Sequence, residues 1–288
     1  MWMEIIKNFI SIALELTFLF VGISFIVNLL QGLIPHDKIK RLLERNNPLS
    51  GAMVALVFAF ITPFCSCSTI PVVVNLLNSK VRFGIVMIFL FASPLLDPAI
   101  ITIMTALLGV KVAAIYTLVT AVLSVIIGFA LEKMGFEKQV KQVVMTGYKE
   151  SANSRGFNAA LKETIIMMKT VYPYLLVGAA IGSVIHDLVP TEWITTYLGG
   201  DQWWMVPVAA IIGIPLYIRL STMIPISQIL IAKGMALGPV MTLMISSAGA
   251  SLPELALLHS IFRKKLVVAF VISVFMMSTL SGWLFYII

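Results

Sequence analysis

The chain has 288 residues, of which 60% are hydrophobic and 11% are charged, and its mean hydropathy is +1.03. Soluble domains carry about 25% charged residues, so this composition excludes an ordinary soluble domain and indicates a polytopic membrane protein. The formal net charge of +7 comes from basic residues in the loops, where they are topology signals and lipid contacts, and we expect no nucleic-acid partner.

Apolar runs long enough to cross a hydrocarbon core of about 30 Å recur along the chain. The first run is too long for the apolar region of a signal peptide and lacks a small-residue cleavage site after it. We therefore expect an all-α, multi-pass protein of the cell inner membrane, surrounded by the lipid bilayer. Its eight predicted membrane segments are residues 9–33, 50–78, 83–109, 112–131, 164–187, 205–231, 236–262 and 265–287.

The chain divides into two predicted membrane repeats of four segments each, with broken helices at the midplane. Residues 1–133 form the first repeat and include an amphipathic interfacial helix at 36–46. Residues 134–163 form a basic linker, which the positive-inside rule places in the cytoplasm, and residues 164–288 form the second repeat.

Three sequence correspondences at a near-constant offset indicate the duplication. Residues 33–43 resemble 188–198, Cys67-Ser-Thr-Ile-Pro71 resembles Ser221-Thr-Met-Ile-Pro225, and residues 93–98 resemble 247–253 with one extra residue. If all four segments of each repeat cross the membrane, the repeats are parallel. If some broken segments are re-entrant hairpins, the repeats are inverted, and the sequence leaves both arrangements open.

The first candidate binding site is the polar stretch Pro63-Phe-Cys-Ser-Cys-Ser-Thr-Ile-Pro71, which interrupts the second apolar segment. Proline lacks an N–H and disfavours helix in the preceding residue, so we expect residues 63–71 to be broken or unwound. Non-helical backbone at membrane depth is tolerated where protein buries it or where it lines a cavity. The candidate substrate-binding residues here are Cys65, Ser66, Cys67, Ser68 and Thr69.

The two cysteines are candidate ligands for a metal or metalloid. Their spacing does not suit a structural disulfide, because the ring would be small and strained. Thiolates prefer soft centres such as Cu(I), Zn(II) or trivalent arsenic. Cys65 and Cys67 alone make an incomplete site, which suits transport because the substrate must also be released. The alternative is that both are unreactive, buried side chains.

A second break is expected at Ser93-Pro-Leu-Leu-Asp-Pro98, which contains Pro94 and Pro98 and the candidate substrate-binding residues Ser93 and Asp97. A carboxylate inside a membrane segment is costly, so we expect Asp97 to be a functional proton acceptor, the cap of the following half-helix, or both. In the second half, Arg219 needs a counter-ion such as Asp97 or Glu254, or else attracts an anionic substrate. The other candidates there are Ser221, Thr222, Ser247 and Ser251, with breaks at Pro225 and Pro253.

The stretch from Pro63 to Pro71, followed by Phe91-Ala-Ser-Pro-Leu-Leu-Asp-Pro98, resembles the ArsP/YraQ-type predicted permeases of bacteria and archaea. The resemblance covers nearly the whole chain. It implies a permease, linked in some members to efflux of trivalent organoarsenicals and in others to soft metals. It also implies Cys65 and Cys67 as thiol ligands, with Asp97 and the prolines shaping the site. Members with such links often have glycine after the second cysteine, where this chain has Ser68, so the resemblance does not fix the substrate.

We therefore expect a transporter, not an enzyme, that exports a thiophilic metal or metalloid species by alternating access. The sequence has no Walker-type loop, so the energy should come from an ion gradient or from the gradient of the substrate itself, and no cofactor is expected. One alternative is a small-anion permease that uses Arg219 as its selector. Another is a membrane thiol oxidoreductase, which would usually need a Cys-x-x-Cys pair and a redox partner. The sequence leaves open whether the chain forms a homo-oligomer.

Overall fold

The computed structural model of the chain describes residues 48–61, 66–141, 202–215, 220–232 and 234–287, and the single positions Leu14, Thr17, Val21, Ile165 and Tyr172. In these residues the regular structure is helical, apart from one isolated β-bridge between Val140 and Phe262. The predicted all-α class is therefore confirmed for the part of the chain that is described.

Four predicted features lie wholly or largely outside the described residues. These are the membrane segments at 9–33 and 164–187, the interfacial helix at 36–46 and most of the basic linker at 134–163. The linker is described only as far as Lys141 and contains one short 3-10 helix, η1 (Phe136–Gln139).

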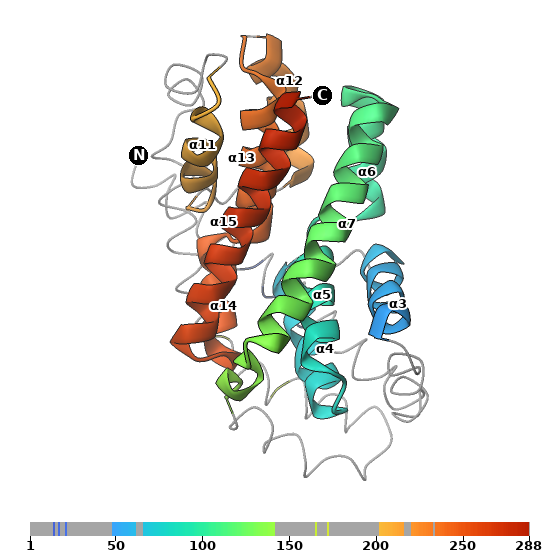
Figure 1. The fold of residues 1–288 in the computed structure, drawn as a ribbon, viewed down its shortest axis with the longest axis vertical. Coiled ribbons are helices and arrows are strands. Elements are labelled where there is room, and N and C mark those ends of the chain that lie inside the picture. The colour runs from blue at the N-terminus through green and yellow to red at the C-terminus, as the bar shows by residue number, and fades with distance from the viewer. Residues whose placement is uncertain are drawn as a thin grey trace.

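The first half is built around a central helix, α5, that is buried on every side. The helices of this half are α3 (Pro48–Ile61), α4 (Ser66–Asn78), α5 (Phe83–Ala92), α6 (Pro98–Leu108) and α7 (Val110–Lys133). All of the residues of α5 are buried, and α3, α4 and α7 pack around it (Figure 1). A helix that is apolar all round is suited to such a core position.

The second half has the same plan around α13. Its helices are α11 (Met205–Gly213), α12 (Leu220–Ala232), α13 (Leu237–Gly249), α14 (Leu252–Ile261) and α15 (Lys264–Ile287). The helices α11, α12 and α15 pack on α13, as α3, α4 and α7 pack on α5. The described helices thus form two apolar cores, one around α5 and one around α13, and each core also contains side chains of the other half.

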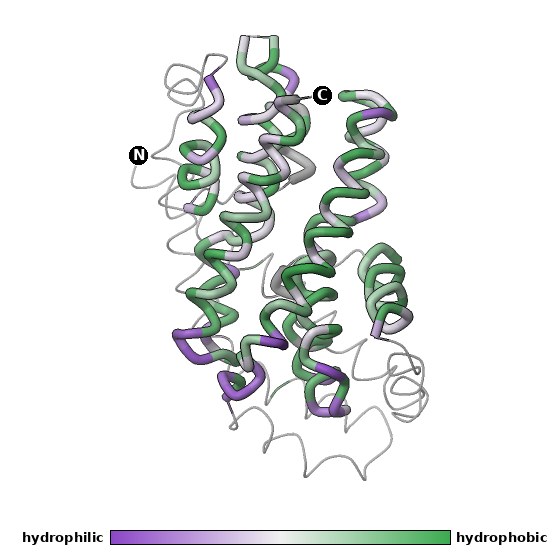
Figure 2. Tube along the Cα trace, in the orientation of Figure 1, coloured by the Kyte–Doolittle hydropathy of each residue, from purple (hydrophilic) through white to green (hydrophobic). Residues whose placement is uncertain are grey.

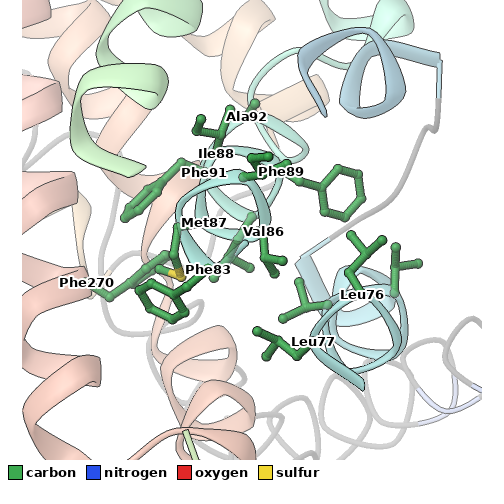
Figure 3. Close-up of a cluster of buried hydrophobic side chains, with 14 of the residues drawn as sticks. Leu76, Leu77, Phe83, Val86, Met87, Ile88, Phe89, Phe91, Ala92 and Phe270 are labelled. Carbon is green, nitrogen blue, oxygen red and sulfur yellow. The ribbon is translucent and has the colours of Figure 1, made fainter. Parts of the chain in front are cut away.

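The core around α5 also joins the two halves. Figure 3 shows Leu76 and Leu77 of α4 on one side of α5 and Phe270 of α15 on the other. The ring of Phe270 stacks on that of Phe91, with ring centroids 4.7 Å apart. Stacked aromatic rings contribute beyond the apolar area that they bury, so this contact helps to hold α15 against the first half.

Two of the described helices, α7 and α15, are long and apolar enough to cross a membrane by themselves. The pair α13 and α14, bent by 43° at its break, would provide a third crossing if it acts as one span. Figure 2 shows apolar residues along the helices and hydrophilic residues gathered at their ends, as in a membrane protein. The total of eight crossings stays a prediction.

The predicted break at residues 63–71 is shorter than the sequence suggested, and the predicted break at Pro225 is not seen in α12. The prediction that residues 63–71 are unwound is wrong for their second part, because α4 begins at Ser66 and continues through Pro71. Pro71 removes only the hydrogen bond to the carbonyl of Cys67, and this carbonyl lies in the first turn, where the chain can adjust to the proline ring. Pro225 likewise lies inside α12 and does not break it.

The breaks that follow α5 and α13 also differ in length. Between α5 and α6, residues 93–97 are not helical, as predicted. In the second half α13 continues through Ser247 to Gly249, so that only residues 250 and 251 separate it from α14. Ser247 is therefore part of a helix and not of the predicted break.

The helix bounds of the two halves recur at an offset of 154 residues. The helix α4 spans 66–78 and α12 spans 220–232, while α7 spans 110–133 and α15 spans 264–287. The helices α5 and α13 begin at 83 and 237, and α6 and α14 begin at 98 and 252. The offset found in the sequence is thus also the offset of the helices.

Candidate functional site

The cysteine motif lies where α3 is followed by α4. Residues 62–65, which include Pro63 and Cys65, are outside the described part of the chain. Ser66, Cys67 and Ser68 are the first residues of α4, and Thr69 is fully buried. The helix α4 packs on α5 and on α14 of the other half. The motif therefore contributes the first turn of a half-helix at the boundary between the two halves.

Asp97 is positioned by its role as the N-cap of α6. Its side chain accepts a hydrogen bond from the backbone N–H of Ala99 at 2.8 Å, and Pro98 is the first residue of the helix. Asp followed by Pro is a strong helix start, because the carboxylate satisfies a free N–H and proline has none to satisfy. Of the two roles considered for Asp97, capping is observed, and proton transfer stays a prediction.

Tyr116 of α7 is a site residue that the sequence analysis missed. Its side chain is fully buried, and its hydroxyl donates a hydrogen bond to the carbonyl of Leu95 at 3.0 Å, within the break between α5 and α6. A carbonyl freed from a helix at membrane depth needs a donor from elsewhere. The sequence could have indicated this role, because Tyr116 lies inside the predicted apolar segment 112–131 and a buried tyrosine hydroxyl normally has a hydrogen-bond partner.

We expect Tyr116→Phe to lower the free energy of unfolding by about 1–3 kcal/mol, because the Leu95 carbonyl loses its donor in apolar surroundings. Thermal unfolding in detergent measures the effect. The matched control is Thr117→Val, which removes a hydroxyl that bonds only within α7, to the carbonyl of Ala113 at 2.8 Å. Equal stability of the two variants would show that the break does not depend on Tyr116.

The corresponding break of the second half carries Ser251 and Glu254. Ser251 is the N-cap of α14, and Glu254 lies in the first turn, with exposed fractions of 7% and 1%. An acid in the first turn of a helix is favoured by the positive end of the helix dipole. Ser247 is also buried, and its hydroxyl donates to the carbonyl of Met244 at 3.2 Å. Since α14 packs on α4, Glu254 lies on the neighbour of the cysteine helix.

The breaks of the two halves meet inside the molecule. The Cδ1 atom of Leu95 lies 4.0 Å from the position that a Cβ would take on Gly249, the last residue of α13. Around this contact each half-helix packs on one from the other half, α4 on α14 and α12 on α6. The break after α5 and the end of α13, which are far apart in the sequence, therefore lie close together, and we call this region the shared centre.

Four helices begin near this centre. The helices α6 and α14 start directly after the two breaks. The helix α4 is joined to α5 by the short turn at 79–82, and α13 begins at Leu237, soon after α12 ends at Ala232. Because α4 packs on α5 and α12 packs on α13, the first residues of α4 and α12 lie near the last residues of α5 and α13. Helix N-termini carry positive partial charge, which Asp97 and Glu254 partly offset.

Some candidates are placed only by their backbone or not at all. Ser221 and Thr222 belong to the first turn of α12, and Arg219 lies outside the described residues, so its predicted pairing with Asp97 or Glu254 stays a prediction. Within the described residues no group of three or more His, Cys, Asp or Glu side chains could hold a metal ion.

The sequence profile of the ArsP_1 family, described as "Predicted permease", matches residues 1–287 of the chain. The UPF0718 protein MJ0584 of Methanocaldococcus jannaschii is 20% identical, over 98% of this chain and 97% of that protein. The UPF0718 protein YraQ of Escherichia coli is 26% identical, over 83% of this chain and 68% of that protein.

A third relative, from Streptococcus mutans, has a name that proposes it as a subunit of a two-component membrane permease complex. It is 19% identical, over 93% of this chain and 90% of its own length. No solved structure matches the chain.

Proposed function

The chain belongs to the ArsP_1 family of predicted permeases, and we propose that it exports a thiophilic metal or metalloid species across the cell inner membrane by alternating access. Membership of this family makes it a membrane permease, and the substrate class and the direction of transport are the proposal. In this proposal the substrate binds where the breaks of the two halves meet.

The observation that carries the proposal is the place of the cysteine motif relative to the meeting of the breaks. Cys67 stands in the first turn of α4, which packs on the helix of Glu254 in the other half. The first turn of a helix favours a negatively charged group, so this position suits a thiolate ligand. A site shared between two halves can open to either side when the halves move relative to one another.

The chemistry of the site would then follow from its residues. Cys65 and Cys67 exchange with the ligands of an incoming soft centre, and each thiol that binds releases its proton. Asp97 or Glu254 would accept a proton released in this step and pass it to the cytoplasm, and the thiols would be reprotonated from the outer side when the substrate leaves, so that protons move inward as the substrate moves outward. Energy for export would come from an ion gradient, which requires no bound cofactor.

The proposal is tested by a substrate panel in cells that lack their own exporters. Cells expressing the protein should survive higher concentrations of trivalent arsenicals or of soft metal ions, and should accumulate less of them, than cells with an empty vector. Oxyanions such as arsenate and sulfate serve as controls within the same panel. Protection against none of the thiophilic compounds would reject the proposed substrate class.

A small-anion permease is the second candidate, and the four helix N-termini near the shared centre favour it. Free backbone N–H groups at helix N-termini bind anions in many proteins. This candidate predicts transport of oxyanions that is unchanged when both cysteines are replaced and is lost in Arg219→Gln. The thiophilic proposal predicts the opposite result for the cysteines.

Capping and proton transfer by Asp97 can be separated by two substitutions. We expect Asp97→Ala to cost about 1 kcal/mol of stability, because the N–H of Ala99 loses its acceptor, while Asp97→Asn keeps the cap. If Asp97 also carries a proton, Asp97→Asn should retain the thermal stability but lose the acceleration of transport by an imposed pH gradient. Full acceleration in Asp97→Asn would limit Asp97 to capping. Ser251→Ala is the stability control, because the side chain of Ser251 makes no capping hydrogen bond.

A further inference from the structure

We infer that the two halves are inverted repeats, related by an approximate two-fold axis in the plane of the membrane, and that each half contains a re-entrant hairpin in place of one of its four crossings. The hairpins are α3 with α4 in the first half and α11 with α12 in the second. The inference concerns the path of the chain through the membrane and does not depend on the substrate proposed above.

Local details show that the halves correspond residue by residue at an offset of 154. The turns after α4 and α12 each have a residue with positive φ at the same place, Lys80 at 58° and Gly234 at 92°. The same backbone hydrogen bond closes both turns, from Val81 N to Leu76 O at 3.1 Å and from Met235 N to Leu230 O at 3.0 Å. Such a turn is common at the end of a helix, so the evidence for duplication is that the positive-φ residue and the hydrogen bond both recur at the 154 offset.

The close helix crossings also correspond. The helices α5 and α7 approach each other at Gly84 and Gly128, where a Cβ on Gly128 would lie 2.8 Å from the carbonyl oxygen of Gly84. The helices α13 and α15 do so at Gly238 and Gly282, where a Cβ on Gly238 would lie 2.7 Å from the carbonyl oxygen of Gly282. Each glycine of the second pair is 154 residues beyond its equivalent in the first.

The direction of the long helices decides between parallel and inverted repeats. After α7 ends, Val140 forms a β-bridge with Phe262, just before α15 begins. Two backbone hydrogen bonds accompany it, from Arg263 N to Gln139 O and from Lys141 N to Ile261 O, each 2.9 Å long. The end of α7 is thus fastened to the start of α15, and Figure 1 shows the two neighbouring helices running in opposite directions. Equivalent helices of parallel repeats would run in the same direction.

The axis passes near the contact between the breaks. Leu95 and Gly249 are related by the 154 offset, and the Cδ1 atom of Leu95 lies 4.0 Å from the position that a Cβ would take on Gly249, so the two positions are close neighbours, as expected near a two-fold axis. The helices that pack across the boundary between the halves fit the same two-fold axis. A rotation about this axis would place the pair α4 and α14 on the pair α12 and α6. The shared centre is therefore also the centre of symmetry.

The lengths and positions of α3 and α4 indicate a hairpin. They have 14 and 13 residues, about 21 and 20 Å, so neither crosses a core of about 30 Å. Both pack on α5, and Figure 1 shows all three in the lower half of the view, with α6 above them. The first half then crosses the membrane three times, through the predicted segment 9–33, the pair α5 and α6, and the helix α7. The second half does so through the predicted segment 164–187, the pair α13 and α14, and the helix α15. A repeat with an odd number of crossings ends on the opposite side of the membrane from its start. The second repeat therefore starts from the other side and has the inverted orientation.

Inverted repeats also place the basic residues 263–265 on the cytoplasmic side, as the positive-inside rule requires. With eight crossings, residues 263–265 would fall on the outer side, against the positive-inside rule. In the structure they adjoin the end of α7 and the start of the basic linker. Figure 2 shows the hydrophilic residues concentrated at this end, which we assign to the cytoplasm. The described basic residues of this end are Lys80, Arg82, Lys133, Lys138, Lys141, Arg263, Lys264 and Lys265.

Inverted repeats give the transporter two equivalent hairpins that face opposite sides. The hairpin of α3 and α4 lies on the cytoplasmic side of the shared centre, and that of α11 and α12 lies on the other side. Exchanging the conformations of the two halves converts an inward-open state into an outward-open state, as in other inverted-repeat transporters. Cys67, in the first turn of α4, would then be reached from the cytoplasm, which suits export.

The matched pair Lys111→Cys and Lys265→Cys tests the inversion. These exposed lysines are equivalent positions at the start of α7 and α15. Each is introduced into Cys65→Ser/Cys67→Ser, which is otherwise free of cysteine. A membrane-impermeant maleimide should label Lys111→Cys in intact cells and Lys265→Cys only in inside-out vesicles. Labelling of both from the same side would overturn the inversion.

Two further measurements test the hairpin of α3 and α4 and provide a topology test that does not need the cysteine-free variant. Pro48→Cys and Lys80→Cys, at the two ends of the first hairpin, should both be labelled only from the cytoplasmic side, and labelling from opposite sides would overturn the hairpin. If the cysteine-free chain fails to fold, alkaline phosphatase fused after Ile288 of the native chain reports the same topology. It should be active outside, whereas eight crossings predict an inactive fusion. Neither measurement requires transport, so failure of the inversion is distinguishable from failure of the proposed substrate.

Discussion

Cys65→Ser/Cys67→Ser is expected to reduce export of a thiophilic substrate at least about ten-fold while leaving the fold intact. A serine hydroxyl is a hard, protonated ligand that binds soft centres far more weakly than a thiolate does. Serine is nearly the same size as cysteine and is well tolerated at the start of a helix. The second half already has Ser221 at the position equivalent to Cys67 in the first turn of α12.

The measurement pairs efflux of the substrate from loaded cells with the melting temperature of the purified protein. Met87→Leu is the control for loss of sulfur, because Met87 is fully buried in α5, outside the cysteine motif in the sequence, and carries a thioether. It should export at the parental rate. A cysteine-free variant that also exports at the parental rate would remove the thiols from the mechanism and favour the anion candidate.

The break between α5 and α6 could be predicted because its cause is local. Pro94 and Pro98 each remove a backbone donor, and Asp97 before Pro98 is a helix start that needs no distant partner. The unbroken helix at 112–131 was predicted for the same reason, since no residue within it interrupts an apolar run. Where the local chemistry decides the structure, the sequence was sufficient.

Other features depend on contacts that one sequence does not reveal. Pro71 was expected to break the helix, but α4 is held by its packing on α5 and α14 and accommodates the proline. The hydroxyl of Tyr116 donates to the carbonyl of Leu95, which lies between α5 and α6, so this contact becomes visible only in the tertiary structure. The 154-residue offset indicated duplication, but the relative direction of the copies depends on where the end of α7 meets the start of α15.

The second large effect is expected from Gly128→Leu, which should cost at least about 3 kcal/mol of stability or prevent accumulation of folded protein. A Cβ on Gly128 would lie 2.8 Å from the carbonyl oxygen of Gly84 and 3.0 Å from the backbone nitrogen of Ile88. Backbone atoms cannot turn aside as a flexible side chain can, so α5 and α7 would have to separate. That separation would open the core around α5.

Ala130→Leu is the matched control for this prediction, because it adds a comparable side chain to an exposed position of α7 just two residues away. It should leave the melting temperature and the yield of monodisperse protein in detergent nearly unchanged. If the halves are equivalent, Gly282→Leu should be as damaging as Gly128→Leu, since a Cβ there would lie 3.0 Å from the carbonyl oxygen of Gly238. Gly128→Leu protein as stable as Ala130→Leu would mean that α5 and α7 do not need their close crossing, and the correspondence of the two glycine pairs would then carry no structural weight.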